Sequence, residues 1–153
     1  MTEEKFRFLD PGRLTDGELE LVLIETTPGN PLTGHVPDYS FEMRAGAARV
    51  GHISLRIGDY DRILMYAGQI GYTVMPEHRG NHYAERACRL LLPLSKAHGQ
   101  TTIWITCNPD NTPSRRTCER LGAELVEIVN LPLEESRRMQ GATRKCRYRV
   151  EVR

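Results

Sequence analysis

The sequence predicts one α/β domain of the α+β type, in which a mixed, mostly antiparallel and twisted sheet is flanked by helices. Three observations support this prediction. The 153 residues suit a single domain with a real core. Segments with strand-like alternation recur through the first half, and the second half reads strand, helix, strand, helix, strand, strand. We therefore treat residues 1–153 as one unit.

The composition is typical of a globular protein without membrane spans. The hydrophobic fraction is 39%, the mean hydropathy is −0.48, and no apolar run approaches the roughly 20 residues of a membrane span. The first residues lack a basic segment followed by an apolar core, so no secretory signal is predicted. We expect a cytoplasmic protein that does not bind a membrane.

The four cysteines are scattered, and none forms a C-x-x-C pair. Structural zinc sites normally show paired spacings, so we expect buried, reduced thiols and no metal. These cysteines are Cys88, Cys107, Cys118 and Cys146.

The net charge of +1 conceals an asymmetry between the two halves. Residues 1–76 hold 7 Lys and Arg against 11 Asp and Glu, a net charge of −4, and residues 77–153 hold 14 against 9, a net charge of +5. A basic half attracts a polyanionic cofactor or a nucleic acid. The arginines are dispersed without interleaved aromatic residues, which argues against a nucleic-acid groove.

The first half should form strands joined by turn-rich segments. Residues 1–17 are turn-rich, and three later segments alternate in polarity as half-buried strands do. A segment with three prolines and two glycines, Thr27–Asp38, should be a loop, and Ala45–Ala48 should be a hairpin turn. The predicted strands are Glu18–Thr26, Tyr39–Arg44 and Arg49–Ile57.

The chain is organised around a strand, a tight polar turn and a helix. Ile70–Met75 has β-branched and aromatic residues at strand spacing, and Pro76 should end this strand because it has no N–H to donate. The turn Glu77–Ala84 leads into a helix, and such a turn directs several N–H groups at the positive end of the helix dipole, which can hold a phosphate group. Pro93 should kink or end the helix. One side of the helix is apolar: Ala84, Ala87, Cys88, Leu91 and Leu94.

The second half should contain three further strands and two further helices. Thr101–Thr106 alternates clearly. A helix should start at Pro113, with Thr112 as its N-terminal cap, run to about Leu121 and be capped by Gly122. The remaining predicted elements are a strand at Glu124–Val129, a short helix near Glu134–Met139 and a strand at Arg147–Val152.

Two motifs in this region resemble those of the GNAT superfamily of acyl-coenzyme A N-acetyltransferases. Arg79-Gly80-Asn81-His82-Tyr83-Ala84 resembles the R-x-x-G-x-G/A pyrophosphate loop, and the preceding residues from Val74 are similar to its V-x-P-x-x-R-G lead-in. His82 stands at the first motif glycine, so we expect an ordinary backbone conformation there, with Gly80 supplying flexibility. The segment from Asn111 to Ala123 resembles N-x-x-A-x-x-x-Y-E-x-L-G-F, with Cys118 at the tyrosine position.

The resemblance covers roughly residues 70–125 and implies a GNAT-like fold that uses acetyl-CoA as co-substrate. It implies that the N–H groups of residues 78–84 bind the pyrophosphate, that the strand lines the pantetheine arm and that an N–H near Val74 polarises the thioester carbonyl. For Asn111, helix capping is the alternative to cofactor binding. The family usually has two helices between its first two strands, where this chain has the loop at 27–38. The implied cofactor-binding residues are Tyr72, Thr73, Val74, His78, Arg79, Gly80, Asn81, His82, Tyr83, Ala84, Asn111 and Ser114.

The catalytic groups are less defined by the sequence. Candidates for the general base are His52 and Glu42, with Tyr72 also considered and Gln69 as a residue that could orient a water. A lone strand histidine can equally be structural. Cys118 is a candidate acid, although a small core residue is the favoured interpretation. His35 and Tyr39 are expected to flank the acceptor entrance.

The leading functional hypothesis is an N-acetyltransferase that transfers the acetyl group of acetyl-CoA directly to a primary amine. The acceptor could be a small amine or a peptide, and a homodimer could complete its pocket. The alternatives are a non-catalytic acyl-CoA-binding regulatory module and a nucleic-acid-binding domain.

Overall fold

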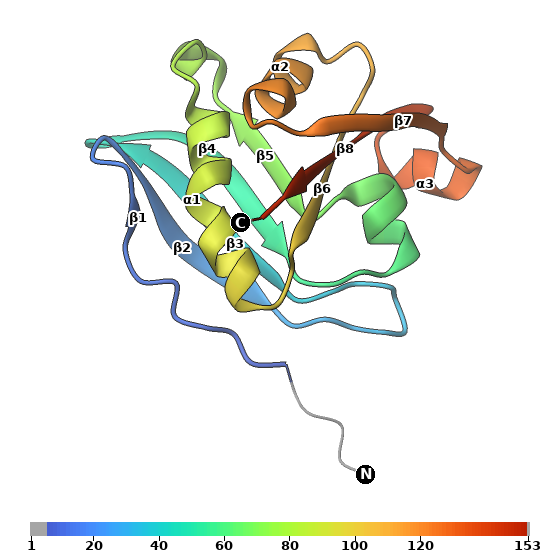
Figure 1. The fold of residues 1–153 in the computed structure, drawn as a ribbon, viewed down its shortest axis with the longest axis horizontal. Coiled ribbons are helices and arrows are strands. Elements are labelled where there is room, and N and C mark those ends of the chain that lie inside the picture. The colour runs from blue at the N-terminus through green and yellow to red at the C-terminus, as the bar shows by residue number, and fades with distance from the viewer. Residues whose placement is uncertain (1–5, 153) are drawn as a thin grey trace.

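A computed structural model of the chain describes residues 6–152. Five strands form one antiparallel sheet in the order β1-β2-β3-β4-β5, and three more form a second antiparallel sheet in the order β6-β8-β7. Helix α1 (Tyr83–Ala97) crosses one face of the first sheet, and α2 (Thr112–Arg120) lies beside the second sheet (Figure 1). The strands are β1 (Leu14–Thr15), β2 (Leu19–Thr27), β3 (Asp38–Ala45), β4 (Ala48–Arg56), β5 (Ile70–Val74), β6 (Thr102–Cys107), β7 (Glu124–Asn130) and β8 (Arg144–Glu151).

The helices differ in length and type. The long helix α1 spans Tyr83–Ala97, α2 spans Thr112–Arg120, and α3 spans Leu133–Arg138 between β7 and β8. A π-helical turn at Ile63–Ala67 precedes β5, and a 3₁₀ turn at Pro76–His78 follows it. The expected fold, an antiparallel sheet flanked by helices, is confirmed. None of the helices in residues 6–152 is long and apolar enough to cross a membrane.

The core lies between α1 and one face of the first sheet. Alternate residues of the strands, including Phe41, Ile53 and Leu55, are fully buried and meet the apolar side of α1 at Ala87 and Leu91. Burying each large side chain contributes about 1.5–3 kcal/mol. The period-2 alternation that predicted these strands therefore also defines which face is covered and which stays polar.

The two sheets are joined at one end of β5 and β6 and separate beyond it. The N–H of Gln69 donates to the Trp104 carbonyl oxygen (2.8 Å), and the Trp104 N–H donates to Oε1 of Gln69 (2.6 Å). No backbone hydrogen bond joins β5 to β6 past this point in the described part of the chain. β5 and β6 thus diverge toward their C-terminal ends, and the two sheets form two separate arms.

The first turn of α1 is held to the β1–β2 hairpin by an ion-pair cluster. Arg86 contacts Asp16 through two nitrogens, at 2.6 and 2.9 Å, and Glu18 at 2.8 Å. The hydrogen bonds from Arg86 hold the pKa of the Asp16 carboxyl well below its usual range. This cluster fixes where the N-terminus of α1 points.

Several local predictions were wrong. The cap of α2 is Asn111, whose side chain accepts the Ser114 N–H at 3.2 Å, and Thr112 is already helical. Of the two outcomes expected at Pro93, a kink or an end, the end is excluded: α1 continues to Ala97, because its packing on the sheet outweighs one lost hydrogen bond. Two short elements, β1 and the π-helical turn, escaped prediction because they are too short to show a period.

Two predictions about side chains near the core had different outcomes. Tyr39 is fully buried, its hydroxyl accepts the Leu9 N–H at 2.7 Å and contacts His98, so it cannot line an acceptor entrance. Its position in the alternation of β3 points it at the core. The four cysteines are all buried and free of disulfides, as predicted.

Candidate functional site

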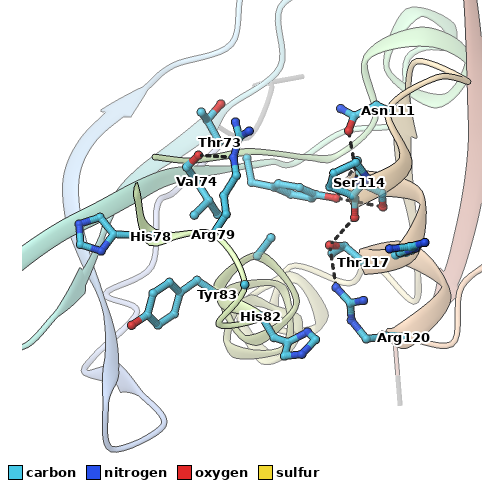
Figure 2. A pocket seen from close by; sticks show the side chains of 15 residues that line it. Thr73, Val74, His78, Arg79, His82, Tyr83, Asn111, Ser114, Thr117 and Arg120 are labelled. Atoms are coloured by element: carbon cyan, nitrogen blue, oxygen red, sulfur yellow. Dashed lines mark hydrogen bonds between the residues drawn. The ribbon is translucent and has the colours of Figure 1, made fainter. Parts of the chain in front are cut away.

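A cleft with a volume of about 460 Å³ opens between the separated arms of the two sheets. Its walls are the end of β5, the turn into α1 and one face of α2, as Figure 2 shows. The cleft brings together two segments that are 30 or more residues apart in the sequence. The lining residues are Tyr72, Thr73, Val74, His78, Arg79, Gly80, His82, Tyr83, Ala84, Asn111, Pro113, Ser114, Arg116, Thr117 and Arg120.

Strand β5 presents to the cleft a backbone edge whose N–H groups have no partner in β4. Gln69 and Met75 exchange hydrogen bonds with β4, because the Arg56 N–H donates to Gln69 O and the Met75 N–H to Val50 O. In an antiparallel ladder the bonded residues alternate, so the N–H groups of Tyr72 and Val74 point away from β4 and into the opening. An extended ligand can therefore pair with β5 as an additional strand.

The turn between β5 and α1 leaves a run of N–H groups without backbone partners. Among the described residues, no backbone hydrogen bond outside the helices and strands uses the N–H groups of residues 80–84. The N-terminal N–H groups of any α-helix lack intrahelical partners, and α1 has no side-chain cap. These groups and the helix dipole are features that could hold an anion at this part of the cleft.

Two details of this turn correct the sequence-based expectations. The N–H groups of His78 and Arg79 donate to Met75 O (2.9 Å) and Pro76 O (3.3 Å), because residues 76–78 form a 3₁₀ turn. They are therefore occupied, unlike those of residues 80–84. His82 adopts a left-handed conformation with φ of 59°, not the ordinary conformation that was expected, because the chain must reverse before α1 starts.

Eleven of the twelve predicted cofactor-binding residues line the cleft. The exception is Asn81, whose Nδ2 donates to the His78 carbonyl oxygen at 3.1 Å and closes the turn. Sequence reasoning missed four lining residues on α2. Their i, i+3, i+4, i+7 spacing places them on one face of α2, which could have identified them: Pro113, Arg116, Thr117 and Arg120.

The charged rim of the cleft is basic. Arg116 is exposed and faces the cleft, and Nε of Arg79 donates to Val74 O at 3.3 Å. Arg120 pairs with Glu85 of α1 at 3.0 Å, which links the two helices across the opening. Cationic groups therefore surround the free N–H groups of the turn, where a phosphate would gain charge-assisted hydrogen bonds.

The hydroxyl groups of Tyr72 and Ser114, two lining residues, meet between β5 and α2. The Tyr72 Oη and the Ser114 Oγ are 2.7 Å apart and connect β5 to α2. Burial raises the pKa of Tyr72 well above its usual range, so it stays protonated. This direction opposes the idea that Tyr72 acts as a general base.

The predicted catalytic residues do not gather at one point. His52 and Glu42 are cross-strand partners on the face of the first sheet away from α1, and His52 is also opposite Thr73. We call this face the outer face. The carboxylate of Glu42 is engaged by Arg44 (3.0 Å) and Arg49 (3.2 Å).

The other two candidates are buried. The Gln69 side chain holds the junction of the sheets: besides accepting the Trp104 N–H, its Nε2 donates to Gly58 O at 3.2 Å. The structure thus assigns Gln69 a structural contact and gives no support for orienting a water. Cys118 is fully buried, and burial raises the pKa of its thiol to about 12, in keeping with a core residue. No cluster of His, Cys, Asp and Glu within residues 6–152 could hold a metal ion.

Comparison with known proteins gives the family. Residues 3–124 match the family described as acetyltransferase (GNAT) domain. No curated protein matches the sequence significantly. The matched segment is about four-fifths of the chain and includes both motifs as far as Glu124.

Solved structures with low sequence identity share the fold. RimL, a ribosomal L7/L12 α-N-protein acetyltransferase in complex with coenzyme A, has 14% identity and a TM-score of 0.67 over 92% of this chain and 98% of that chain. A putative ribosomal-protein-serine acetyltransferase from Vibrio cholerae has 16% identity and a TM-score of 0.64 over 94% and 99%. The microcin C7 self-immunity acetyltransferase MccE, in complex with acetyl-CoA and AMP, has 19% identity and a TM-score of 0.59 over 75% of this chain and 61% of that chain. The family match and the shared architecture agree, and the chain belongs to the GNAT acetyltransferase family.

Proposed function

We propose that this chain is an N-acetyltransferase that moves the acetyl group of acetyl-CoA directly to a primary amine. One observation carries the proposal. A single cleft has a run of free N–H groups at a helix N-terminus at one end and the unpaired edge of β5 along its side. A diphosphate with an extended amide-containing arm fits both features, and coenzyme A has this chemistry.

The residues of the turn supply the diphosphate site. The N–H groups of residues 80–84 donate to the phosphate oxygens, and Arg79 and Arg116 add positive charge beside them. Hydrogen bonds between charged partners contribute about 1.5–3 kcal/mol each. Several of them in one turn supply most of the binding energy of the nucleotide end.

The edge of β5 positions the thioester. The Tyr72 and Val74 N–H groups face the cleft, and the Val74 N–H polarises the thioester carbonyl as a small oxyanion hole. Asn111 uses its Oδ1 to cap α2, which leaves its Nδ2 for the amide oxygens of the pantetheine arm. The predicted alternatives for Asn111, capping and cofactor binding, are thus compatible.

The amine approaches from the outer face of the first sheet. Helices α1 and α2 and the cofactor occupy the other side, so the outer face beside Thr73 is where a nucleophile can reach the carbonyl carbon. His52 stands there opposite Thr73, and the side-chain hydrogen bonds to histidine rings in residues 6–152 involve His35 and His98 instead. We assign the general base to His52 in preference to Glu42, whose oxygens are held by two arginines.

The acceptor is a small amine or a peptide. The segment between β2 and β3 is a loop, closed by backbone hydrogen bonds between Asn30 and His35, and no helix covers the outer face in residues 28–37. An open face suits an extended acceptor such as a protein N-terminus, the acceptor named for RimL. A second copy of the chain could also complete the wall as a homodimer.

A thiol-release assay tests the proposal. Acetyl-CoA is offered with a panel of small amines, amino acid amides and peptides with free N-termini, and free CoA is measured with a thiol reagent. Acceptor-dependent release, with acetylated product seen by mass spectrometry, is the expected result.

The second candidate is a non-catalytic acyl-CoA-binding module, which the uncovered outer face and the cysteine at position 118 favour. Tight acetyl-CoA binding in calorimetry, with no release for any acceptor, would decide for this module. Failure of acetyl-CoA and CoA to bind at all would refute both functions.

A further inference from the structure

The hydroxyl of Tyr72 lies in the cleft, where β5 comes within hydrogen-bond distance of α2. It lies 2.7 Å from the Ser114 hydroxyl and 3.5 Å from the Ser114 carbonyl oxygen. Ser114 is buried in the first turn of α2, and Cys118 is one turn further along the same face. The Tyr72–Ser114 pair is thus the point where β5 and α2 meet.

Cofactor geometry brings the reacting sulfur to this point. If the diphosphate sits on residues 80–84 and the arm runs back along β5, the thioester reaches the level of Val74 and Tyr72. The neighbouring thiol of Cys118 is fully buried and cannot reach the cleft. Tyr72 and Ser114 are the lining residues whose hydroxyl groups meet between β5 and α2, whereas the nearby Thr117 hydroxyl donates to Pro113 O at 3.0 Å.

We infer that the Tyr72 hydroxyl, supplied from β5, receives the leaving sulfur of coenzyme A through a hydrogen bond, with Ser114 supporting it. The inference rests on the proposed function and adds a catalytic residue to it. This residue would stabilise charge on the sulfur, a part of the reaction that the Val74 N–H and His52 do not serve.

The step balances without a net proton transfer from tyrosine. The amine nitrogen forms a bond to the carbonyl carbon, the C–S bond breaks, and its electron pair stays on sulfur as a thiolate. His52 takes the proton of the amine. Tyr72 O–H donates to the thiolate while Ser114 O–H donates to the Tyr72 oxygen, a chain in which each bond strengthens the next. Solvent protonates the thiolate when CoA leaves.

The protonation state of Tyr72 suits this role. Burial raises the pKa of its phenol, so the hydroxyl remains a donor throughout the working range of pH. A phenol of this kind does not give up its proton to a thiolate, whose parent thiol has a pKa near 8.5. It stabilises the charge by hydrogen bonding, as an oxyanion hole does.

The first test compares Tyr72→Phe with a matched control. The variant keeps the ring and removes the hydroxyl, and we expect kcat to fall about 10- to 100-fold with KM for acetyl-CoA changed less than about threefold. The control is Tyr148→Phe, which removes a buried hydroxyl that also braces α2, through Nε of Arg115 at 3.0 Å, but does not line the cleft. Turnover of the control should stay within about twofold.

The second test needs no acceptor. Calorimetry compares CoA with desulfo-CoA, which lacks the sulfur, between pH 7 and 9.5. As the CoA thiol ionises, the wild type should come to prefer CoA by about 10-fold over desulfo-CoA, and Tyr72→Phe should lose this preference while binding desulfo-CoA normally. Ser114→Ala should reduce the preference partially.

Other groups near Tyr72 do not produce the same signal. The thiols of Cys118 on α2, Cys88 on α1 and Cys107 on β6 face it, and burial raises their pKa values, to about 12 for Cys118 and about 11 for Cys107. They remain neutral over the range tested. The other titratable or charged groups of the cleft can also act on the thiolate, but they are the same in wild type and in Tyr72→Phe, so their effect cancels when the preferences of the two proteins are compared: His78, Arg79, His82, Arg116 and Arg120.

The outcomes separate the inference from the proposed function. The inference is overturned if Tyr72→Phe keeps its turnover. It is also overturned if the variant loses affinity equally for CoA and desulfo-CoA, as expected when the hydroxyl has only a structural role. Wild-type protein that binds neither ligand overturns the proposed function itself. Thermal unfolding of each variant shows that the fold is kept.

Discussion

The proposed cofactor side and the proposed acceptor side of the site consist of different kinds of chemical group. On the cofactor side the groups are backbone N–H donors of the turn and of β5, fixed by a helix start and a strand edge. On the acceptor side the groups are side chains of the outer face, such as Glu42 and His52, on strands with no helix over them. Backbone groups can thus form the site of a ligand that stays the same, the cofactor. Side chains form the site of a ligand that varies, the acceptor.

Gly80→Pro is the strongest test of whether backbone N–H groups of the turn form the cofactor site. Gly80 has φ of +96°, which proline cannot adopt, and its N–H belongs to the run that faces the cleft. We expect CoA affinity to fall about 10³-fold, because two or three charge-assisted hydrogen bonds are lost. Calorimetry with CoA measures the effect.

Gly99→Pro is the matched control for this change. Gly99 also has a positive φ, of +83°, but follows α1 at its far end, and its N–H donates to Lys96 O at 2.8 Å. The control should lose more stability and keep its CoA affinity. Equal loss of affinity in both variants would mean that the turn is not the diphosphate site.

On the acceptor side, His52→Gln should lower kcat/KM for the amine by roughly 10²-fold, because a general base contributes about this much. CoA affinity should stay within about threefold, since His52 faces away from the cofactor. Steady-state kinetics with the best acceptor, together with calorimetry, check both values.

Glu42→Gln is its control on the same face. The Glu42 carboxylate is already paired with Arg44 and Arg49, so removing its charge should change kcat/KM less than about threefold. A large effect of Glu42→Gln with little effect of His52→Gln would reverse the assignment of the base.

The difference between the two sides explains what the sequence could and could not predict. The strand–turn–helix from Ile70 to Ala97 was predictable because its signals are local. The alternation of the strand, Pro76 at its end and Gly80 in the turn each determine the conformation of only a few neighbouring residues. The Tyr72–Ser114 contact joins residues 42 positions apart, and no local pattern reports it. Tyr39 shares the buried face of β3 with Phe41, two residues further on, so its expected place at the acceptor entrance was wrong.

Conformation at single residues was the least predictable feature. His82 was expected to be ordinary because non-glycine residues rarely adopt positive φ. The structure nevertheless gives it φ of 59°, since the turn must direct consecutive N–H groups to one side before α1 begins. Strained backbone of this kind is found at ligand sites when the surrounding structure enforces it.

His82→Gly asks whether the turn works through its backbone alone. Removing the side chain relieves the left-handed strain, partly offset by the greater freedom of glycine when unfolded, so the free energy of unfolding should rise by about 0.5–1 kcal/mol. CoA affinity should change less than about threefold. Denaturant unfolding and calorimetry measure the two effects.

Gln140→Gly controls for the strain. Gln140, after α3, is the other described non-glycine residue with positive φ, at 58°, and does not line the cleft. It should gain a similar stability. A marked loss of CoA affinity in His82→Gly alone would show that the imidazole itself binds the cofactor.

The smallest expected effect concerns how the cofactor side is held in place. Asp16→Asn weakens the ion pair with Arg86 that fixes the first turn of α1, and because both side chains are partly exposed the cost at pH 7 should be only about 1 kcal/mol. The folded state lowers the pKa of Asp16, so its contribution is present above the ordinary value of 3.8 and is lost as the pH falls below it. Unfolding by urea at pH 7 and pH 3 should therefore show a stability difference between wild type and variant that shrinks at the lower pH.

Glu20→Gln, which breaks an exposed pair with Arg13 away from α1, should show almost no difference at either pH. A difference for Asp16→Asn that persists unchanged at pH 3 would mean that packing, and not charge, anchors the helix that presents the diphosphate site.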